Sequence, residues 1–294
     1  MSKSKLLEKV IPLDDAQADR DIALLDNFSK SFNAKRNKLI KKAVTEPEQL
    51  SFLPTQLCRT TIFFPLPRRG RKALQAEPVI LSFTTKWGKG EYEGRRLSVD
   101  DEDILMVCLY LAKKYESNKF LTTYVEIQRL LRISKPHPKY NRQIKESFTR
   151  FGKASFFIEY ANKKDDQWSV DHILKARGYK GKIRVTLDSD FYNEFLKSYT
   201  LLSMPFRMNL KGDLTKLLFT FLSSHRTPVQ YFTDTLVEAL NMNQDKNKKH
   251  IVQELKSAFK ELQNKGFLID FKYDKKQDIF KLKTVERKKW KALK

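Results

Sequence analysis

The residue types that usually perform catalysis or bind metals are scattered along this sequence. No histidine has a second histidine or a cysteine at the spacing of metal ligands. The sequence has no GxxxxGK[ST] loop, and no GxGxxG segment follows a strand-like run, so no motif for nucleotide hydrolysis is visible. The histidines are His137, His172, His225 and His250. We therefore expect no metal, no cofactor and no enzymatic activity.

One acidic run could hold a metal ion for phosphoryl chemistry, or could simply begin a helix. It follows Ser98, a preferred helix N-cap residue, and precedes apolar residues at helical spacing. Carboxylates in a first turn complement the positive end of a helix. The run consists of Asp100, Asp101, Glu102 and Asp103. We favour the helical interpretation.

Composition favours a polyanionic partner. Lysine and arginine number 58 against 35 acidic residues, a formal net charge of +23, and 40% of residues are hydrophobic, enough for two domains. The sequence contains no run of about 18 apolar residues, and its first residues lack the apolar centre of a signal peptide. We expect a cytoplasmic bacterial protein that avoids membranes, with Cys58 and Cys108 as buried, reduced thiols.

Three helices and two strands are predicted after Ser98. The first helix carries the acidic run, and the second is "TTYVEIQRLLR", with Val125 and Ile127 facing inward. The third spans about 139–151, "ASFFIEY" follows as a strand, and "KGKIRVTL" is its expected return partner. This order is typical of a winged helix-turn-helix.

The same order recurs nearer the C-terminus. The helices are "GDLTKLLFTFLSSH", "FTDTLVEALNM" and "KKHIVQELKSAFKELQNKG", followed by the hairpin "FLIDFKYDKKQDIFKLK". Apolar positions of the two copies match at offsets of 110 and 111 residues, as Ile144 with Leu255 and Phe156 with Phe267, which indicates internal duplication; chance agreement is the alternative. The predicted fold is α+β, with tandem winged-helix domains at 49–200 and 201–284, a flexible arm at 1–48 and a basic tail at 285–294.

A recognition helix reads the major groove with its exposed residues, and a wing lies along the phosphate backbone. The exposed positions predicted to bind DNA in the first copy are Lys139, Asn141, Arg142, Gln143, Lys145 and Arg150, with Lys163 and Lys164 at the wing. Those in the second copy are Lys248, Lys249, Gln253, Lys256 and Lys260, with Lys272, Lys275 and Lys276 at the wing. An ordinary solvated helix face is the alternative for each helix.

Two further basic stretches lie outside the copies. "RRGRK" at 68–72 and the tail "KTVERKKWKALK" could add phosphate contacts or could serve solubility.

The order of elements resembles that of TrfA-type plasmid replication initiators and, more broadly, iteron-binding initiators with two winged-helix domains. The residues that carry the resemblance are "YEGRRLSVDDEDILMVCLYLAKK", "RVTLDSDFYNEFLKSYTLL" and "LKSAFKELQNKGFLIDF". The resemblance implies a protein that binds direct repeats of double-stranded origin DNA, helps to open the adjacent duplex and recruits host replication proteins such as the helicase and its loader. It also implies a monomer–dimer equilibrium. The alternatives are a transcriptional regulator of the same fold and, less favoured, a nickase or primase.

A short peptide precedes the first domain. "QLSFL" resembles the motif by which bacterial replication proteins dock on the sliding clamp, although its last two residues are reversed. It comprises Gln49, Leu50, Phe52 and Leu53, and the alternative is a hydrophobic anchor for the arm.

Overall fold

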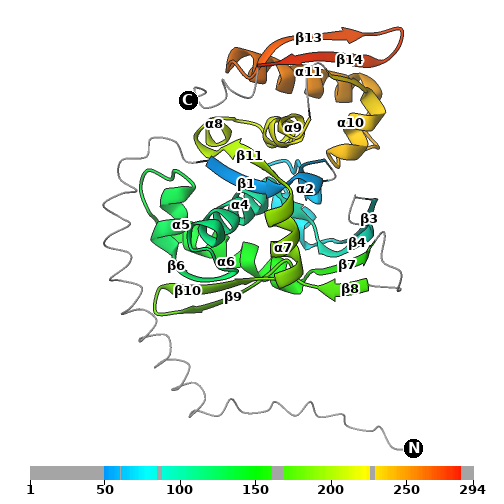
Figure 1. Cartoon of the computed structure of the whole chain (residues 1–294). Helices are drawn as coiled ribbons and strands as arrows, with labels where there is room; N and C mark the ends of the chain where they lie inside the picture. Colours follow the sequence, from blue (N-terminus) through cyan, green and yellow to red (C-terminus); the bar gives the residue numbers. More distant parts are fainter. Residues whose placement is uncertain (1–49, 60, 85–87, 161–167, 226–228, 286–294) are drawn as a thin grey trace, which may run out of the picture. The chain divides into compact units, whose positions relative to one another are not determined.

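A computed structural model describes residues 50–59, 61–84, 88–160, 168–225 and 229–285 (Figure 1). All of these residues fall within one compact unit, Glu48–Lys294. The predicted arm and basic tail lie outside the described residues. Among the helices of these five ranges, none has the length and apolar character that crossing a membrane requires.

The first winged-helix copy combines three helices with a three-stranded sheet of order β6-β10-β9. The first helix has a capping box, in which Ser98 and Asp101 satisfy each other's free backbone N–H groups. The elements, in chain order, are α4 (Val99–Lys114), β6 (Lys119–Thr123), α5 (Tyr124–Leu130), α6 (Pro138–Lys153), β9 (Leu174–Tyr179) and β10 (Lys182–Leu187).

The second copy has the same topology, with its last strand in the middle of the sheet, in the order β12-β14-β13. All its pairings are antiparallel, as in the first copy. Its elements are α9 (Asp213–Ser223), β12 (Val229–Phe232), α10 (Thr233–Ala239), α11 (Lys248–Asn264), β13 (Leu268–Asp274) and β14 (Ile279–Thr284). The protein is therefore an α+β protein with tandem winged-helix domains.

The predicted first wing was wrong in one respect, because a hairpin is inserted after α6. Strand β7 (Ser155–Tyr160) pairs with β4 (Gly88–Arg95) and with β8 (Trp168–Asp171), whereas β10 pairs with β6 and β9. The sheet order is β3-β4-β7-β8, where β3 is Pro78–Thr84. The match between Phe156 and Phe267 is therefore coincidental, and the duplication resumes only at β9.

The remaining elements link and flank the two copies. Strand β11 pairs antiparallel with β1, so it extends across the predicted boundary between residues 200 and 201, and β2 pairs parallel with β5. These elements are β1 (Leu50–Pro54), α2 (Thr55–Arg59), β2 (Phe63–Phe64), α3 (Arg71–Ala76), β5 (Leu97–Ser98), α7 (Ser189–Lys197), β11 (Tyr199–Ser203) and α8 (Met204–Met208).

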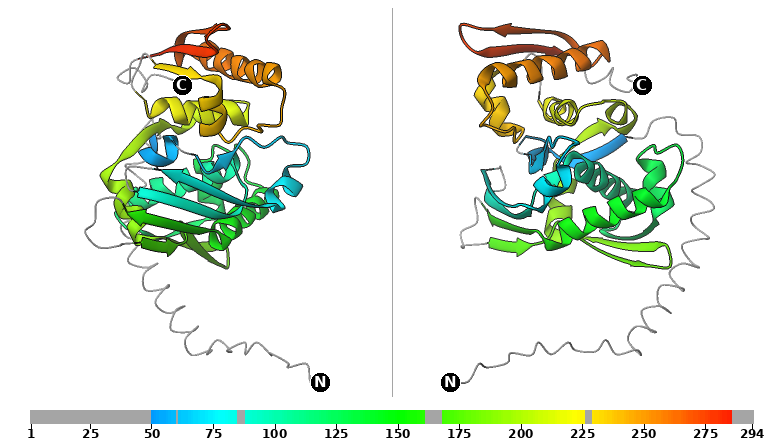
Figure 2. Two further views of the ribbon diagram at one scale, coloured as in Figure 1. Left: turned by 90° about the vertical axis from the view of Figure 1, so that its right-hand side faces the viewer. Right: turned by 180° about the vertical axis from the view of Figure 1, so that it is seen from behind.

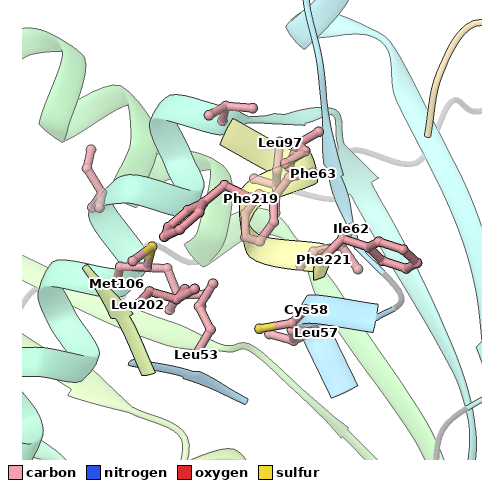
Figure 3. Close-up of a cluster of buried hydrophobic side chains, with 14 of the residues drawn as sticks. Leu53, Leu57, Cys58, Ile62, Phe63, Leu97, Met106, Leu202, Phe219 and Phe221 are labelled. Atoms are coloured by element: carbon pink, nitrogen blue, oxygen red, sulfur yellow. The ribbon is translucent and has the colours of Figure 1, made fainter. Parts of the chain in front are cut away.

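A continuous hydrophobic cluster joins residues of both copies. Figure 3 shows Met106 of α4 and Phe219 of α9 in this cluster, together with Leu53 and Cys58 from the N-terminal segment. Both cysteines are free and buried, as predicted, and burial raises the pKa of each thiol.

One predicted core position was wrong. Val125 is 47% exposed, whereas Ile127 is fully buried. Residues two apart on a helix point about 200° apart, so the two side chains cannot share one face of α5. Ile127 faces the core, and Val125 therefore faces solvent.

Candidate nucleic-acid interface

Helix α6 presents a basic face above an apolar one. His137 caps the helix by accepting a hydrogen bond from the Lys139 backbone N–H, and Pro138 occupies the first turn, where no N–H is needed. Ile144 and Phe148 are buried, as predicted. The predicted contact residues that are exposed on this helix are Lys139, Arg142, Gln143 and Lys145.

Asn141 is only half exposed and supports the turn before α6. Its Oδ1 accepts a hydrogen bond of 2.6 Å from Gln128 Nε2, and Gln128 Oε1 accepts one of 2.9 Å from the His137 backbone N–H. Since Gln128 is buried, this pair fixes how α5 leads into α6. Asn141 therefore positions the helix, whatever else it contacts.

Arg150 was predicted to face solvent, and this was wrong. Its Nη2 donates to Asp101 Oδ1 at 2.6 Å, and its Nε donates to both carboxylate oxygens at 3.1 and 3.2 Å. The Asp101 side chain has no exposed surface, so the guanidinium is needed to neutralise it. Arg150 therefore ties α6 to the first turn of α4.

The first wing is the β9–β10 hairpin, which sequence analysis misplaced. Its two-residue tip, Lys180–Gly181, has positive φ angles of 44° and 77°, as in the primed turns that suit a tight hairpin. The cations Lys175, Arg177, Lys180 and Lys182 are exposed on it. The motif "YKGK" between two strand-like runs could have revealed this turn. The predicted wing residues Lys163 and Lys164 lie outside the described residues.

A groove of 670 Å³ separates α6 from this wing. Figure 2 shows α6 running beside the β9–β10 hairpin. Lys145 and Lys153 line the groove from α6, and the four wing cations line it from the hairpin. We call it the wing groove; its cation density suits a phosphate backbone.

Helix α11 carries the second basic face. Asn247 caps it by accepting a hydrogen bond from the Lys249 backbone N–H. Ile251, Leu255 and Phe259 are buried. The predicted contact residues Lys249, Gln253, Lys256 and Lys260 are exposed at spacings of four, three and four residues, so they form one stripe.

The second wing, β13–β14, is fixed to both neighbouring helices through Asp278. Its carboxylate accepts hydrogen bonds from Thr233 Oγ1 at 2.6 Å and from the Tyr273 hydroxyl at 2.7 Å, and it pairs with Lys248 Nζ at 2.6 Å. Thr233 begins α10 and Lys248 begins α11. Partial burial alone would raise the pKa of Asp278, but these three donors outweigh it and hold the pKa below its ordinary value.

The predicted wing residues Lys272, Lys275 and Lys276 are exposed. The backbone N–H groups of Lys276 and Gln277 donate to Asp274 Oδ1, which shapes the wing tip. Lys248 differs from the other predicted contacts because it is already paired with Asp278.

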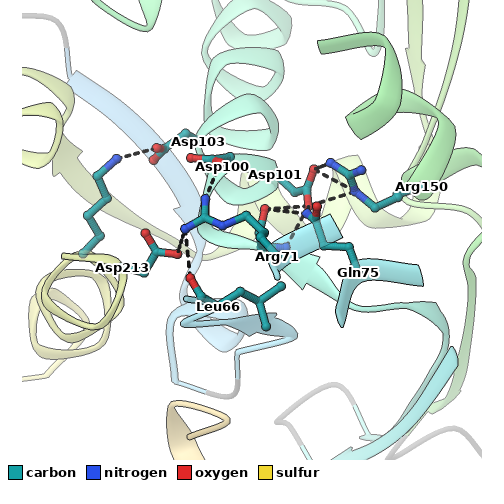
Figure 4. Close-up of polar contacts among 10 residues, drawn as sticks. Leu66, Arg71, Gln75, Asp100, Asp101, Asp103, Arg150 and Asp213 are labelled. Carbon is teal, nitrogen blue, oxygen red and sulfur yellow. Dashed lines mark hydrogen bonds and ion pairs between the residues drawn. The ribbon is translucent and has the colours of Figure 1, made fainter. Parts of the chain in front are cut away.

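The acidic run at the start of α4 does more than begin the helix. Figure 4 shows Arg71 bound to Asp100 at 2.6 Å and to Asp213 at 2.7 Å, and it shows the pair of Asp101 and Arg150. Every carboxylate of the run has a cationic partner, so the run joins separate elements. In the part of the chain that the structure describes, no group of three or more His, Cys, Asp or Glu residues could hold a metal ion.

The deepest of these pairs connects the two copies. Arg207 of α8 is fully buried; its Nε donates to Asp103 Oδ1 at 2.6 Å and its Nη2 donates to Glu102 Oε2 at 2.7 Å. Lys216 of α9 pairs with Asp103 at 2.8 Å, and Thr220 of α9 accepts a hydrogen bond from Arg207. Sequence analysis missed this network, because nothing in the spacing of its members indicates that they meet.

Burial acts on both carboxylates of the network, with different outcomes. It raises the pKa of Glu102 despite the opposing charge of Arg207. It acts in the same direction on Asp103, but Arg207 and Lys216 together outweigh it and lower the pKa of that carboxyl. Asp103 is therefore the carboxylate more firmly held in its charged form.

The peptide that resembles a clamp-docking motif is part of the folded unit. Leu50 to Pro54 pair as β1 with β11, and Leu53 is fully buried. Phe52 lies against Tyr199, with ring centroids 5.3 Å apart, and Lys113 Nζ sits 4.1 Å from the Phe52 ring. Gln49 lies outside the described residues. Because its described residues are engaged, the stretch is an anchor and not the accessible peptide that clamp docking would need.

Comparison with known proteins supports the resemblance to replication initiators. Residues 91–223 match the family Rep3_N, described as "Initiator Replication protein, WH1". No curated protein sequence matches the chain. The matched segment begins within β4 and ends with α9, so it contains the complete first winged-helix copy.

Solved structures with similar folds include two replication-related proteins. Domains 2 and 3 of RctB align with a TM-score of 0.53 at 13% identity, over 79% of this chain and 98% of that chain. The Pi initiator protein in complex with iteron DNA aligns with a TM-score of 0.41 at 15% identity, over 57% of this chain and 82% of that chain. The RctB alignment spans both winged-helix copies at the level of fold. Residues 91–223 of the chain thus belong to the WH1 family of replication initiator proteins.

Proposed function

We propose that this protein initiates plasmid replication by binding direct repeats in double-stranded origin DNA through α6 and α11. The observation that carries the proposal is that both helices hold the third position of a winged helix and expose cations beside an amide. Cations bind phosphates, while arginine and glutamine can make paired hydrogen bonds to base edges. The match to the initiator family supports replication initiation as the role.

The proposal includes the later steps that the resemblance implies. The bound protein promotes opening of the adjacent duplex and recruits host replication proteins, and its free form exchanges between monomer and dimer. It acts by binding alone, without catalysis in this chain. The net charge of +23 favours fast association with DNA at low salt.

Footprinting on its own origin region tests the proposal. Two recognition helices on one continuous site should protect roughly two helical turns, about 20 base pairs, for each monomer bound to a direct repeat. Scrambled repeats of equal composition serve as the control. Protection of one inverted repeat over a promoter, with no direct repeats bound, would instead favour a transcriptional regulator.

Substitutions separate base reading from phosphate binding. Arg142→Ala or Gln253→Ala should reduce the preference for repeats over scrambled DNA, by about 1–3 kcal/mol for each pair of base hydrogen bonds that is removed. Lys275→Ala with Lys276→Ala should weaken binding to every sequence and flatten its salt dependence. If the lysine variant keeps the wild-type salt slope, those lysines do not contact phosphates.

A further inference from the structure

A second basic hollow lies on the other flank of α6. It has a volume of 330 Å³ and is lined by α3, β4 and α6. Lys145, Thr149 and Lys153, at spacings of four residues, form a ridge of α6 that lines both this hollow and the wing groove. We call it the α3 hollow, after the short helix that forms its far wall.

The α3 hollow contains more positive charge than its surroundings neutralise. Arg150 is paired with Asp101, and Glu146 is the one carboxylate among the lining residues. The other cations are exposed, and within the described ranges none of them has an ion-pair partner. They are Lys72, Arg95, Arg142, Lys145 and Lys153.

The far wall is held in place by its own contacts. Gln75 of α3 donates to Ser98 Oγ at 2.9 Å and to Asp101 Oδ2 at 3.3 Å, and Asp101 is also the partner of Arg150 (Figure 4). Arg71, at the start of α3, binds Asp100 and Asp213. One buried carboxylate therefore fixes both α3 and α6, so the spacing between the two walls is set before any ligand binds.

From this arrangement we propose that the α3 hollow binds the phosphate backbone of DNA on the side of α6 opposite to the first wing. The inference rests on the proposed function, because it takes α6 as a helix that enters the major groove. That groove is about 12 Å wide and is bordered by one backbone on each side. With cations along both flanks, α6 can contact both borders, the wing groove taking one backbone and the α3 hollow the other.

The chemistry of the hollow suits phosphates better than a protein partner. Five unpaired cations repel one another, and a polyanion relieves this repulsion while releasing its own counterions. Their long, exposed side chains offer charge without an apolar surface around which a partner could pack. The basic stretch at 68–72 thereby gains a role, since Lys72 belongs to it.

Binding measurements on the full chain test this inference. The variant K72A/R95A removes two cations of the α3 hollow that lie outside α6. Its affinity for a repeat duplex and for a scrambled duplex should fall by the same factor. The slope of log K against log salt should become shallower by about 1.8, or roughly 0.9 for each phosphate that the variant no longer neutralises. An unchanged slope would overturn the inference.

A matched control removes the same charge elsewhere. K89A/K211A also removes two exposed cations, and Lys89 lies on β4 with Arg95. This variant should keep the wild-type slope, and an equal slope change in both variants would show that only net charge matters and would also overturn the inference. The proposed function is judged separately, by whether the wild-type protein prefers repeats, because the salt slope on scrambled DNA tests the hollow either way.

Discussion

The third helices of the two copies are tethered at the same place by opposite charges. Arg150 of α6 and Glu261 of α11 correspond at the offset of 111 residues. Arg150 reaches Asp101 in the first turn of α4, whereas Glu261 accepts hydrogen bonds from the Lys211 backbone N–H at 2.7 Å and from Thr215 Oγ1 at 2.9 Å, at the start of α9.

What remains constant is a carboxylate at the start of the first helix. In the first copy that carboxylate belongs to the first helix, and in the second it arrives from the third helix. Both arrangements place negative charge at the positive end of a helix dipole. The fold therefore requires the tether but leaves open which helix supplies the acid, so equivalent positions can diverge in charge while the structure is kept.

The largest expected effect comes from breaking the first tether. Arg150→Met leaves Asp101 buried without a partner, which should lower the free energy of unfolding by about 3–5 kcal/mol. Urea titration of the full chain measures this loss. Adding Asp101→Asn should recover part of it, because the uncompensated charge is then removed.

Glu261→Met provides the comparison for that measurement. It removes hydrogen bonds to neutral donors at a half-buried site, so the expected loss is about 1–2 kcal/mol. Equal losses in Arg150→Met and Glu261→Met would contradict the distinction between the two tethers.

The two wings differ in a second way, since one is held by side chains and the other by its turn. Asp278→Ala removes the acceptor that joins the second wing to α10 and α11, and should cost about 1–2 kcal/mol. Hydrogen exchange should speed up in β13 and β14 and remain unchanged in β9 and β10. Faster exchange in both hairpins would mean that the wings are not independent.

The turn of the first wing can be tested at Gly181. With φ at 77°, this position disfavours any side chain, so Gly181→Ala should cost about 1 kcal/mol. Gly152→Ala is a control, because its Cβ would meet no atom within 4 Å. Thermal melts of the two variants should separate, and identical melting temperatures would argue against a turn-determined wing.

Acid should loosen the second wing selectively, by the smallest amount of all. Because the pKa of Asp278 is held below its ordinary value of 3.8, its contribution is complete above that pH and is lost as pH falls below it. Hydrogen exchange of β13 and β14 between pH 5 and pH 3, corrected for intrinsic rates, measures the effect. The acid response should disappear in Asp278→Asn, which carries no charge at either pH.

Local patterns in the sequence predicted the helices well and the strand pairings less well. The cap at Ser98 and the apolar spacing of Ile144 and Phe148 depend on neighbours within a few residues, and the structure confirms them. The partner of β7 depends on β4, more than 60 residues away, which no local pattern contains. The inserted β7–β8 hairpin therefore concealed the true first wing.

Charged positions were the least predictable part of the candidate interface. An exposed face of a helix follows from its apolar face, so Lys145 and Gln253 were correctly placed at the surface. Arg150 and Arg207 could not be assigned in this way, because each is neutralised by carboxylates about 50 and about 100 residues away in sequence. Whether an arginine binds DNA or a buried acid is decided by tertiary contacts.

The buried position of Arg207 also limits how such proteins can recombine. A hybrid that joins the first copy of one initiator to the second copy of another would bring Glu102 and Asp103 against a foreign residue at position 207. Without a cation there, two buried carboxylates would lack their main partner. Viable hybrids should therefore inherit α4 and α8 from the same parent, even when the remainder of the second copy is exchanged.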